Sequence, residues 1–203
     1  ERLVGSEMCI RDSNSAELLF FTNHAQVYKS RASEFADTKA SVLGDYVASK
    51  LEMEEGEVPL FMTVTVDYRG YMLFFYQNGK CAKIPLASYM TKQNRRKLLK
   101  AYSDKEELAA MLHIEEETEL AVFTSGGTGG PRLILVGSAL IPEKATRDTA
   151  GINMVTLKKN ARIAKVRPAA GLELKDPHRY RVRTLPAAGA LLRQEDTTEQ
   201  MSL

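Results

Sequence analysis

The sequence predicts an all-β fold of propeller-like blades, with about four short strands in each blade and about three blades in the 203-residue chain. Three observations lead to this prediction: a repeat of about 50 residues, a hairpin pattern in each repeat, and an ordinary globular composition. With 44% apolar and 27% charged residues, the chain can bury a core, which excludes a largely disordered or collagen-like class.

Each repeat opens with two apolar, β-rich segments joined by a turn of Asn or Gly, which is the pattern of a hairpin. The first copy is Glu17–Lys29, and Tyr71–Lys83 aligns with it at an offset of 54 residues. The third copy consists of Glu119–Gly127 and Arg132–Val136, with the four residues 128–131 inserted between them. This recurrence predicts that three hairpins form the centres of three sheets.

Further β-like runs complete each repeat. Gly44–Ala48 and Gly151–Val155 each begin a run after a polar loop, and Leu60–Val66 and Ala161–Val166 are expected to be the last strands. Residues 94–112 contain good helix formers, so propensity alone would favour a helix there. We give the repeat precedence and expect strands in that segment too.

The two ends of the chain do not follow the repeat. Residues 1–12 have the character of a translated adapter, so we leave them out of the fold and expect the natural chain to continue upstream of Ser13. Residues 171–203 are expected to form a basic and then flexible tail. The expected blades cover residues 15–66, 67–117 and 118–170.

The small net charge of +2 conceals a segregated pattern. Residues 91–105 contain six basic residues against one acid, and residues 157–167 contain five basic residues and no acid. Acidic residues gather instead in 52–57 and 115–119. Each segment alone is compatible with a solvated loop. If the basic segments share one rim of a repeat protein, they form a positive stripe that attracts polyanions.

The sequence predicts no metal site and no catalytic site. The two cysteines and three histidines are far apart and lack the spacing of metal ligands, and such cysteine usage favours a reducing cytoplasm. Ser125–Gly130 lacks the Gly-Lys-Ser/Thr of a phosphate-binding loop and lies between two strands, so we expect a hairpin loop. No apolar run approaches the roughly 20 residues that a bilayer-spanning helix needs.

These segments are similar to the C-terminal region of the A subunit of bacterial type IIA topoisomerases, that is, gyrase or topoisomerase IV. The similarity covers most of residues 15–192 and is strongest to versions from clostridia-like Gram-positive bacteria. The segments that carry it are Leu18–Asn23, Leu73–Lys80, Asp37–Asp45, Thr156–Lys159 and His178–Pro186.

The resemblance implies a β-pinwheel, a relative of the propeller whose blades exchange a strand and whose basic rim binds and bends DNA. Members of the family usually have more than three blades. The resemblance further implies a cleavage domain of the same chain, an ATPase B subunit in an A2B2 assembly, use of Mg²⁺ and ATP by the intact enzyme, and a bacterial, nucleoid-associated location. None of the eight tyrosines here has a catalytic context, so the chain itself is expected to be non-catalytic and without a cofactor.

One family motif is missing. Gyrase carries a basic box of the form Gln-Arg-Arg-Gly-Gly-Lys-Gly, and the corresponding loops here, residues 37–44, 94–100 and 145–151, do not match it. Either the box lies outside this chain or the parent protein is closer to topoisomerase IV, and the sequence favours the second explanation.

The predicted function is sequence-nonspecific binding and bending of double-stranded DNA, in support of ATP-dependent changes of DNA topology by the intact enzyme. Lys and Arg suit this task because they displace the counterions of the phosphates without reading bases. The alternative is a propeller-like scaffold that binds proteins and has no DNA role. The candidate DNA-binding residues are Lys29, Arg31, Lys39, Lys83, Lys92, Arg95, Arg96, Lys97, Lys100, Arg147, Lys158, Lys159 and Arg162.

Overall fold

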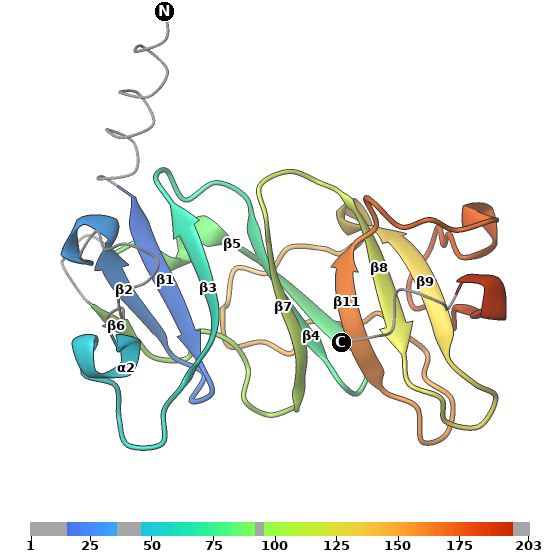
Figure 1. Ribbon diagram of the computed structural model, residues 1–203, viewed down its shortest axis with the longest axis horizontal. Helices are drawn as coiled ribbons and strands as arrows, with labels where there is room; N and C mark the ends of the chain where they lie inside the picture. The colour runs from blue at the N-terminus through green and yellow to red at the C-terminus, as the bar shows by residue number, and fades with distance from the viewer. Residues whose placement is uncertain (1–15, 36–45, 92–95, 197–203) are drawn as a thin grey trace, which may run out of the picture. The chain divides into compact units, whose positions relative to one another are not determined.

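The computed structural model describes residues 16–35, 46–91 and 96–196. It consists of three four-stranded antiparallel sheets joined by loops and short helices, which confirms the predicted all-β fold (Figure 1). The chain divides into two compact units. Of the described residues, the first unit contains 16–35, 46–69, 86–91 and 96–102, and the second contains 70–85 and 103–196.

The first unit holds one sheet, which we name the first sheet, with strand order β3-β1-β2-β6. Its hairpin pairs Phe20 with Tyr28, and these two rings pack with Leu51 in a small core. The edge strand β3 leaves alternate aliphatic side chains, such as Leu60 and Met62, about half exposed. The strands and short helices of this unit are β1 (Glu17–Thr22), β2 (Val27–Arg31), η1 (Ala32–Glu34), α2 (Val47–Lys50), β3 (Pro59–Thr65), η2 (Leu86–Tyr89) and β6 (Lys97–Leu98).

The second unit holds the second sheet, of order β10-β5-β4-β7, and the third sheet, of order β11-β8-β9-β12. Phe75 of the second sheet and Val122 of the third lie in one hydrophobic core, so the two sheets bury each other's faces. The elements are β4 (Tyr71–Tyr76), β5 (Lys80–Pro85), β7 (Leu108–Ile114), β8 (Glu119–Thr124), β9 (Arg132–Gly137), η3 (Ser138–Leu140), β10 (Ile152–Asn153), β11 (Ile163–Pro168), η4 (Pro177–Arg179), β12 (Ala190–Leu191) and η5 (Gln194–Asp196).

The fourth strand of each sheet comes from a later part of the chain. β6 follows the second hairpin in sequence but pairs with β2, and β10 follows the third hairpin but pairs with β5. The strand exchange implied by the family resemblance is therefore present. As a result, each sheet extends past the boundary that the repeat alone predicts for its blade.

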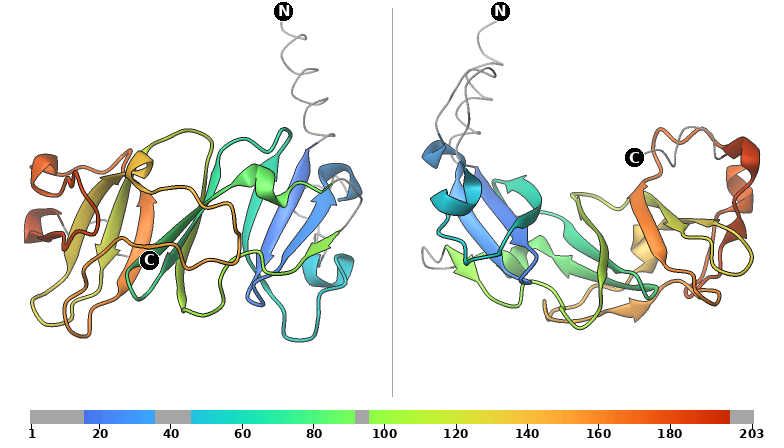
Figure 2. Two further views of the ribbon diagram at one scale, coloured as in Figure 1. Left: turned by 180° about the vertical axis from the view of Figure 1, so that it is seen from behind. Right: turned by 60° about the horizontal axis from the view of Figure 1, so that its bottom comes forward.

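The third sheet takes its fourth strand from the segment expected to be a tail. Ala190–Leu191 form β12 beside β9, and the Tyr180 hydroxyl donates a 2.6 Å hydrogen bond to Asp196. Tyr180 and Leu192 lie in one hydrophobic cluster with Phe123 of β8 and Leu133 of β9. Figure 2 shows the orange and red segment that contains them beside the third sheet. Burial of these side chains explains why residues up to 196 form ordered structure where the sequence predicts flexibility.

Two further segments test the expected strands. The described part of residues 94–112 contains β6 and the start of β7. This confirms the strands that the repeat predicts there, in place of the helix that propensity alone would favour. The expected strand from Gly44 is wrong where the structure describes it, because Val47–Lys50 form the one-turn helix α2. Val47 and Leu51 pack against Phe20 and Tyr28, which favours the helix. Within the described residues, no helix is both long and apolar enough to span a membrane.

Candidate nucleic-acid interface

Two of the predicted DNA-binding lysines occupy equivalent, buried places in two hairpins. Lys29 pairs with Leu19 across the first hairpin, and Lys83 pairs with Leu73 across the second. The two lysines are only 8% and 3% exposed. Because a buried ammonium group needs a partner for its charge, each is expected to be committed to an internal contact.

Each buried lysine has an acid and a tyrosine ring beside it. The Lys29 Nζ lies 3.5 Å from Glu17 Oε2 and 5.1 Å from the centre of the Tyr68 ring. The Lys83 Nζ forms an ion pair with Glu117 and lies 4.3 Å from the centre of the Tyr71 ring.

Both lysines also donate hydrogen bonds, Lys29 to Thr91 Oγ1 at 3.2 Å and Lys83 to the Ser138 carbonyl at 3.2 Å. Their ammonium groups are occupied inside the protein, which argues against the predicted phosphate contacts for Lys29 and Lys83.

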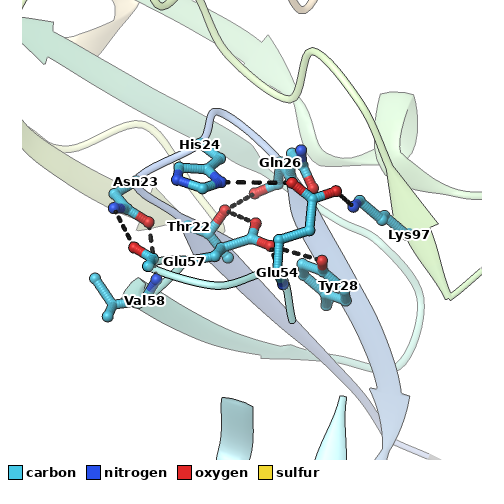
Figure 3. Close-up of polar contacts among 10 residues, drawn as sticks. Thr22, Asn23, His24, Gln26, Tyr28, Glu54, Glu57, Val58 and Lys97 are labelled. Atoms are coloured by element: carbon cyan, nitrogen blue, oxygen red, sulfur yellow. Dashed lines mark hydrogen bonds and ion pairs between the residues drawn. The ribbon is translucent and has the colours of Figure 1, made fainter. Parts of the chain in front are cut away.

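Lys97 belongs to a polar network at one end of the first sheet (Figure 3). Its Nζ lies 2.5 Å from Glu54 Oε1, and Glu54 Oε2 lies 3.7 Å from His24 Nδ1. Beside them, the buried Glu57 accepts hydrogen bonds from Thr22 and from Tyr28. The hydrogen bond to Glu54 raises the pKa of Lys97 and keeps it charged.

The same network contains the one group of potential metal ligands among the described residues. His24, Glu54 and Glu57 offer ligand atoms within 4.8 Å of one another. However, Glu54 is paired with Lys97, and both oxygens of Glu57 already accept hydrogen bonds. The contacts of these residues are therefore satisfied by the protein, and we assign the network a structural role.

Glu57 makes the stability of the first unit depend on pH. Burial alone would raise the pKa of its carboxyl, but hydrogen bonds from Thr22, Tyr28 and the Glu54 N–H hold that pKa below the ordinary value. Its contribution is thus complete above the unfolded pKa of about 4.3 and is lost as the pH falls through the lower folded value. We expect Glu57→Gln to destabilise the chain at pH 7 and to flatten the loss of stability below pH 4.5, as measured by urea unfolding at several pH values. An unchanged acid profile would contradict this assignment.

In each sheet, the turn of the hairpin lies beside the loop that precedes the third strand, and these three loops differ in charge. The residue after the first hairpin strand donates its N–H to the last residue of the loop that precedes the third strand. The three bonds are Asn23 to Val58 at 3.1 Å, Gln77 to Glu107 at 2.8 Å and Ser125 to Arg162 at 2.8 Å. In the first sheet this loop is acidic, with residues such as Glu54, and in the second sheet it is mixed in charge but ends on Glu106 and Glu107. In the third sheet it carries Lys158, Lys159 and Arg162.

The basic loop of the third sheet is exposed and held firmly. Lys158, Lys159 and Arg162 are all exposed, and no acidic side chain of the described ranges lies within ion-pair distance of them. The Thr128 N–H donates a 3.0 Å bond to the Lys159 carbonyl, in addition to the bond from Ser125 to Arg162. Figure 1 shows the β8–β9 loop and the loop before β11 side by side at the same end of this sheet. This basic turn, residues 158–162, is the described segment best suited to bind phosphates.

The other predicted residues lie in several places. Arg31 is exposed at the end of β2, and the Arg96 side chain is 67% exposed with its Nη2 3.6 Å from Glu34 Oε2. Lys100 is exposed in the first unit, and Arg147 is half-buried in the second, between β9 and β10. Lys39, Lys92 and Arg95 lie outside the described residues.

One residue of this surface was missed in the sequence. Gly127 has a φ of +54°, and a Cβ built on it would lie 2.7 Å from the Lys159 carbonyl oxygen. The Gly-rich segment 125–130 is visible in the sequence. Its position beside the basic turn is not, because that position depends on how the strands of the third sheet pair.

Comparison with solved structures identifies the fold. The chain is 18% identical to a "C-terminal domain of DNA topoisomerase IV", with a TM-score of 0.71, and 88% of the chain matches 58% of that domain. It is 14% identical to a DNA gyrase A C-terminal domain, with a TM-score of 0.60, and 87% of the chain matches 60% of that domain. It is 11% identical to the E. coli ParC C-terminal domain, with a TM-score of 0.64, and 89% of the chain matches 78% of that domain.

Sequence comparison adds no closer relative, because no protein-family model and no curated protein matches the chain. The chain spans less than two thirds of the topoisomerase IV and gyrase A domains. Three four-stranded sheets with exchanged fourth strands agree with the similarity in fold. The chain therefore has the β-pinwheel fold of the C-terminal domains of topoisomerase IV and gyrase A subunits.

Proposed function

We propose that this chain binds double-stranded DNA without sequence preference, as a non-catalytic module of a type II topoisomerase A subunit. The observation that carries the proposal is the exposed, acid-free turn of Lys158, Lys159 and Arg162 on a fold shared with topoisomerase C-terminal domains. Such cations bind phosphates at any sequence, because counterion release does not depend on the bases.

In the proposed role, the module holds a DNA segment for a cleavage domain of the same chain. Bending 20 to 30 base pairs costs on the order of 1 to 6 kcal/mol, which several phosphate contacts can offset. The cleavage chemistry, with its Mg²⁺, and the ATPase B subunit of the A2B2 assembly belong to the intact enzyme. We propose a bacterial, nucleoid-associated location on the same basis.

Competition between duplexes tests the proposal. Fluorescence anisotropy with a labelled 30-base-pair duplex is expected to show binding at 0.1 M salt. Unlabelled duplexes of unrelated sequence should compete equally well, because the contacts are made to phosphates. A strong preference for one sequence would contradict this mode of binding, and no binding would contradict the function itself.

A protein-binding scaffold is the second candidate function. The edge strand β3 presents Leu60, Met62 and Val64 about half exposed, and such apolar rows are typical of surfaces that contact another protein. This candidate is favoured if the chain fails to bind duplex DNA at 0.1 M salt.

A further inference from the structure

The basic turn of the third sheet owes its position to the Gly-rich loop beside it. Residues 125–130 lie in the loop that connects β8 to β9, and they run along residues 158–162, which precede β11. Two backbone hydrogen bonds, from Ser125 to Arg162 and from Thr128 to Lys159, join the segments. The Ser125 Oγ also accepts a 3.1 Å bond from the Arg162 N–H. A turn fixed at both ends presents its cations with little loss of conformational freedom on binding.

Gly127 is the residue at which the two segments come closest. A Cβ on Gly127 would lie 2.7 Å from the Lys159 carbonyl oxygen, 2.8 Å from the Ala161 nitrogen and 2.9 Å from the Ala161 Cβ. Real Cβ atoms do not approach backbone atoms so closely, so any side chain here would push residues 159–161 away. The left-handed φ of +54° also favours glycine.

The neighbouring glycines leave space on the same loop. Nothing lies within 4 Å of a Cβ built on Gly126 or on Gly129. The absence of side chains at these positions lets a bulky polyanion approach the adjacent turn. The corresponding loops of the first two sheets lie beside acidic residues, such as Glu54 and Glu106, and lack this combination.

We propose that residues 125–130 and 158–162 form one phosphate-binding surface for duplex DNA, in which Gly127 is a positioning residue for Lys158, Lys159 and Arg162. This inference rests on the proposed function and deepens it. Gly127 contributes no charge and no contact to the DNA. It allows the turn to lie against the loop, so that the three cations face the duplex as a group.

The test compares Gly127→Ala with Gly171→Ala in the full chain. At 0.1 M salt, one phosphate contact is worth about eightfold in affinity, because each contact contributes about 0.9 to the salt slope. Gly127→Ala is expected to raise the Kd for a 30-base-pair duplex by about eightfold or more and to lower that slope by about 0.9. Gly171→Ala is expected to match the wild type in affinity and in salt slope, because Gly171 also has a positive φ, of +80°, but its Cβ would meet nothing and it lies outside residues 125–130 and 158–162.

A milder variant keeps the inference testable if Gly127→Ala does not fold, as judged by circular dichroism. Ser125→Ala removes the side-chain bonds to Arg162 and is expected to weaken DNA binding in the same direction, but less. If the wild type binds DNA and the folded variants bind equally well, the inference is wrong and the proposed function stands. A weaker Gly127→Ala with an unchanged salt slope would also overturn it. If the wild type does not bind, the proposed function fails first.

Discussion

Gly151→Ala is expected to lower the free energy of unfolding by about 3 kcal/mol or more. Gly151 has a φ of +73°, and a Cβ there would lie 1.9 Å from the Cys81 carbonyl oxygen. The left-handed conformation alone costs alanine roughly 1–2 kcal/mol. The clash adds to this cost, because the backbone must move away from β5 and break the pairing of Ile152 with Cys81.

Gly171→Ala is the matched control for this prediction. Gly171 lies in the same unit with a φ of +80°, but nothing lies within 4 Å of its Cβ position. It should therefore show only the conformational cost, about 1–2 kcal/mol. Chemical unfolding of both variants measures the difference. Equal losses would show that the close approach to β5 is absent.

The largest expected effect on DNA binding comes from reversing charge in the basic turn. Lys158→Glu combined with Lys159→Glu is expected to weaken duplex binding about 60-fold at 0.1 M salt, because two contacts of about eightfold each are lost. The salt slope should fall by about 2. Fluorescence anisotropy over a range of salt concentrations measures both quantities. The combination of Lys105→Glu and Lys144→Glu changes the net charge equally and is expected to have a much smaller effect.

Replacement of Lys83 is expected to lower stability and to leave DNA binding unchanged, in contrast to the charge reversal in the basic turn. Its ammonium group is buried between Glu117, the Tyr71 ring and the Ser138 carbonyl. Lys83→Met should therefore lower stability, by about 1–3 kcal/mol, because Glu117 and the Ser138 carbonyl lose their partner. The folded variant is expected to bind DNA with the wild-type salt slope. A fall in that slope by about 1 would restore Lys83 to the DNA-contacting set.

The hairpins could be predicted from sequence because their signals are local. Each hairpin is a contiguous stretch of sequence with two β-rich segments joined by a short turn of Asn or Gly. The occurrence of three such copies strengthens the prediction. The exchanged strands have no such signal. β6, β10 and β12 are two residues long, and their pairing depends on where a distant segment of the chain returns.

The candidate site was predicted in part for the same reason. Lys158, Lys159 and Arg162 were found because their charge is concentrated in a short segment without acids. The charge of Lys83 led to its prediction as a surface residue. In the structure it lies two residues after the buried Cys81 on β5 and therefore on the same, buried face. Its partner Glu117 is 34 residues away in sequence, and only the folded structure brings them together.

The dependence of duplex affinity on salt tests the central claim most directly. If exposed cations on this β-sheet scaffold bind the DNA backbone, the logarithm of the association constant falls linearly with the logarithm of salt concentration. Three contacts from the basic turn predict a slope of at least about 2.7 in magnitude. An affinity that does not change between 50 and 200 mM salt, or the absence of binding at the lower concentration, would contradict the account.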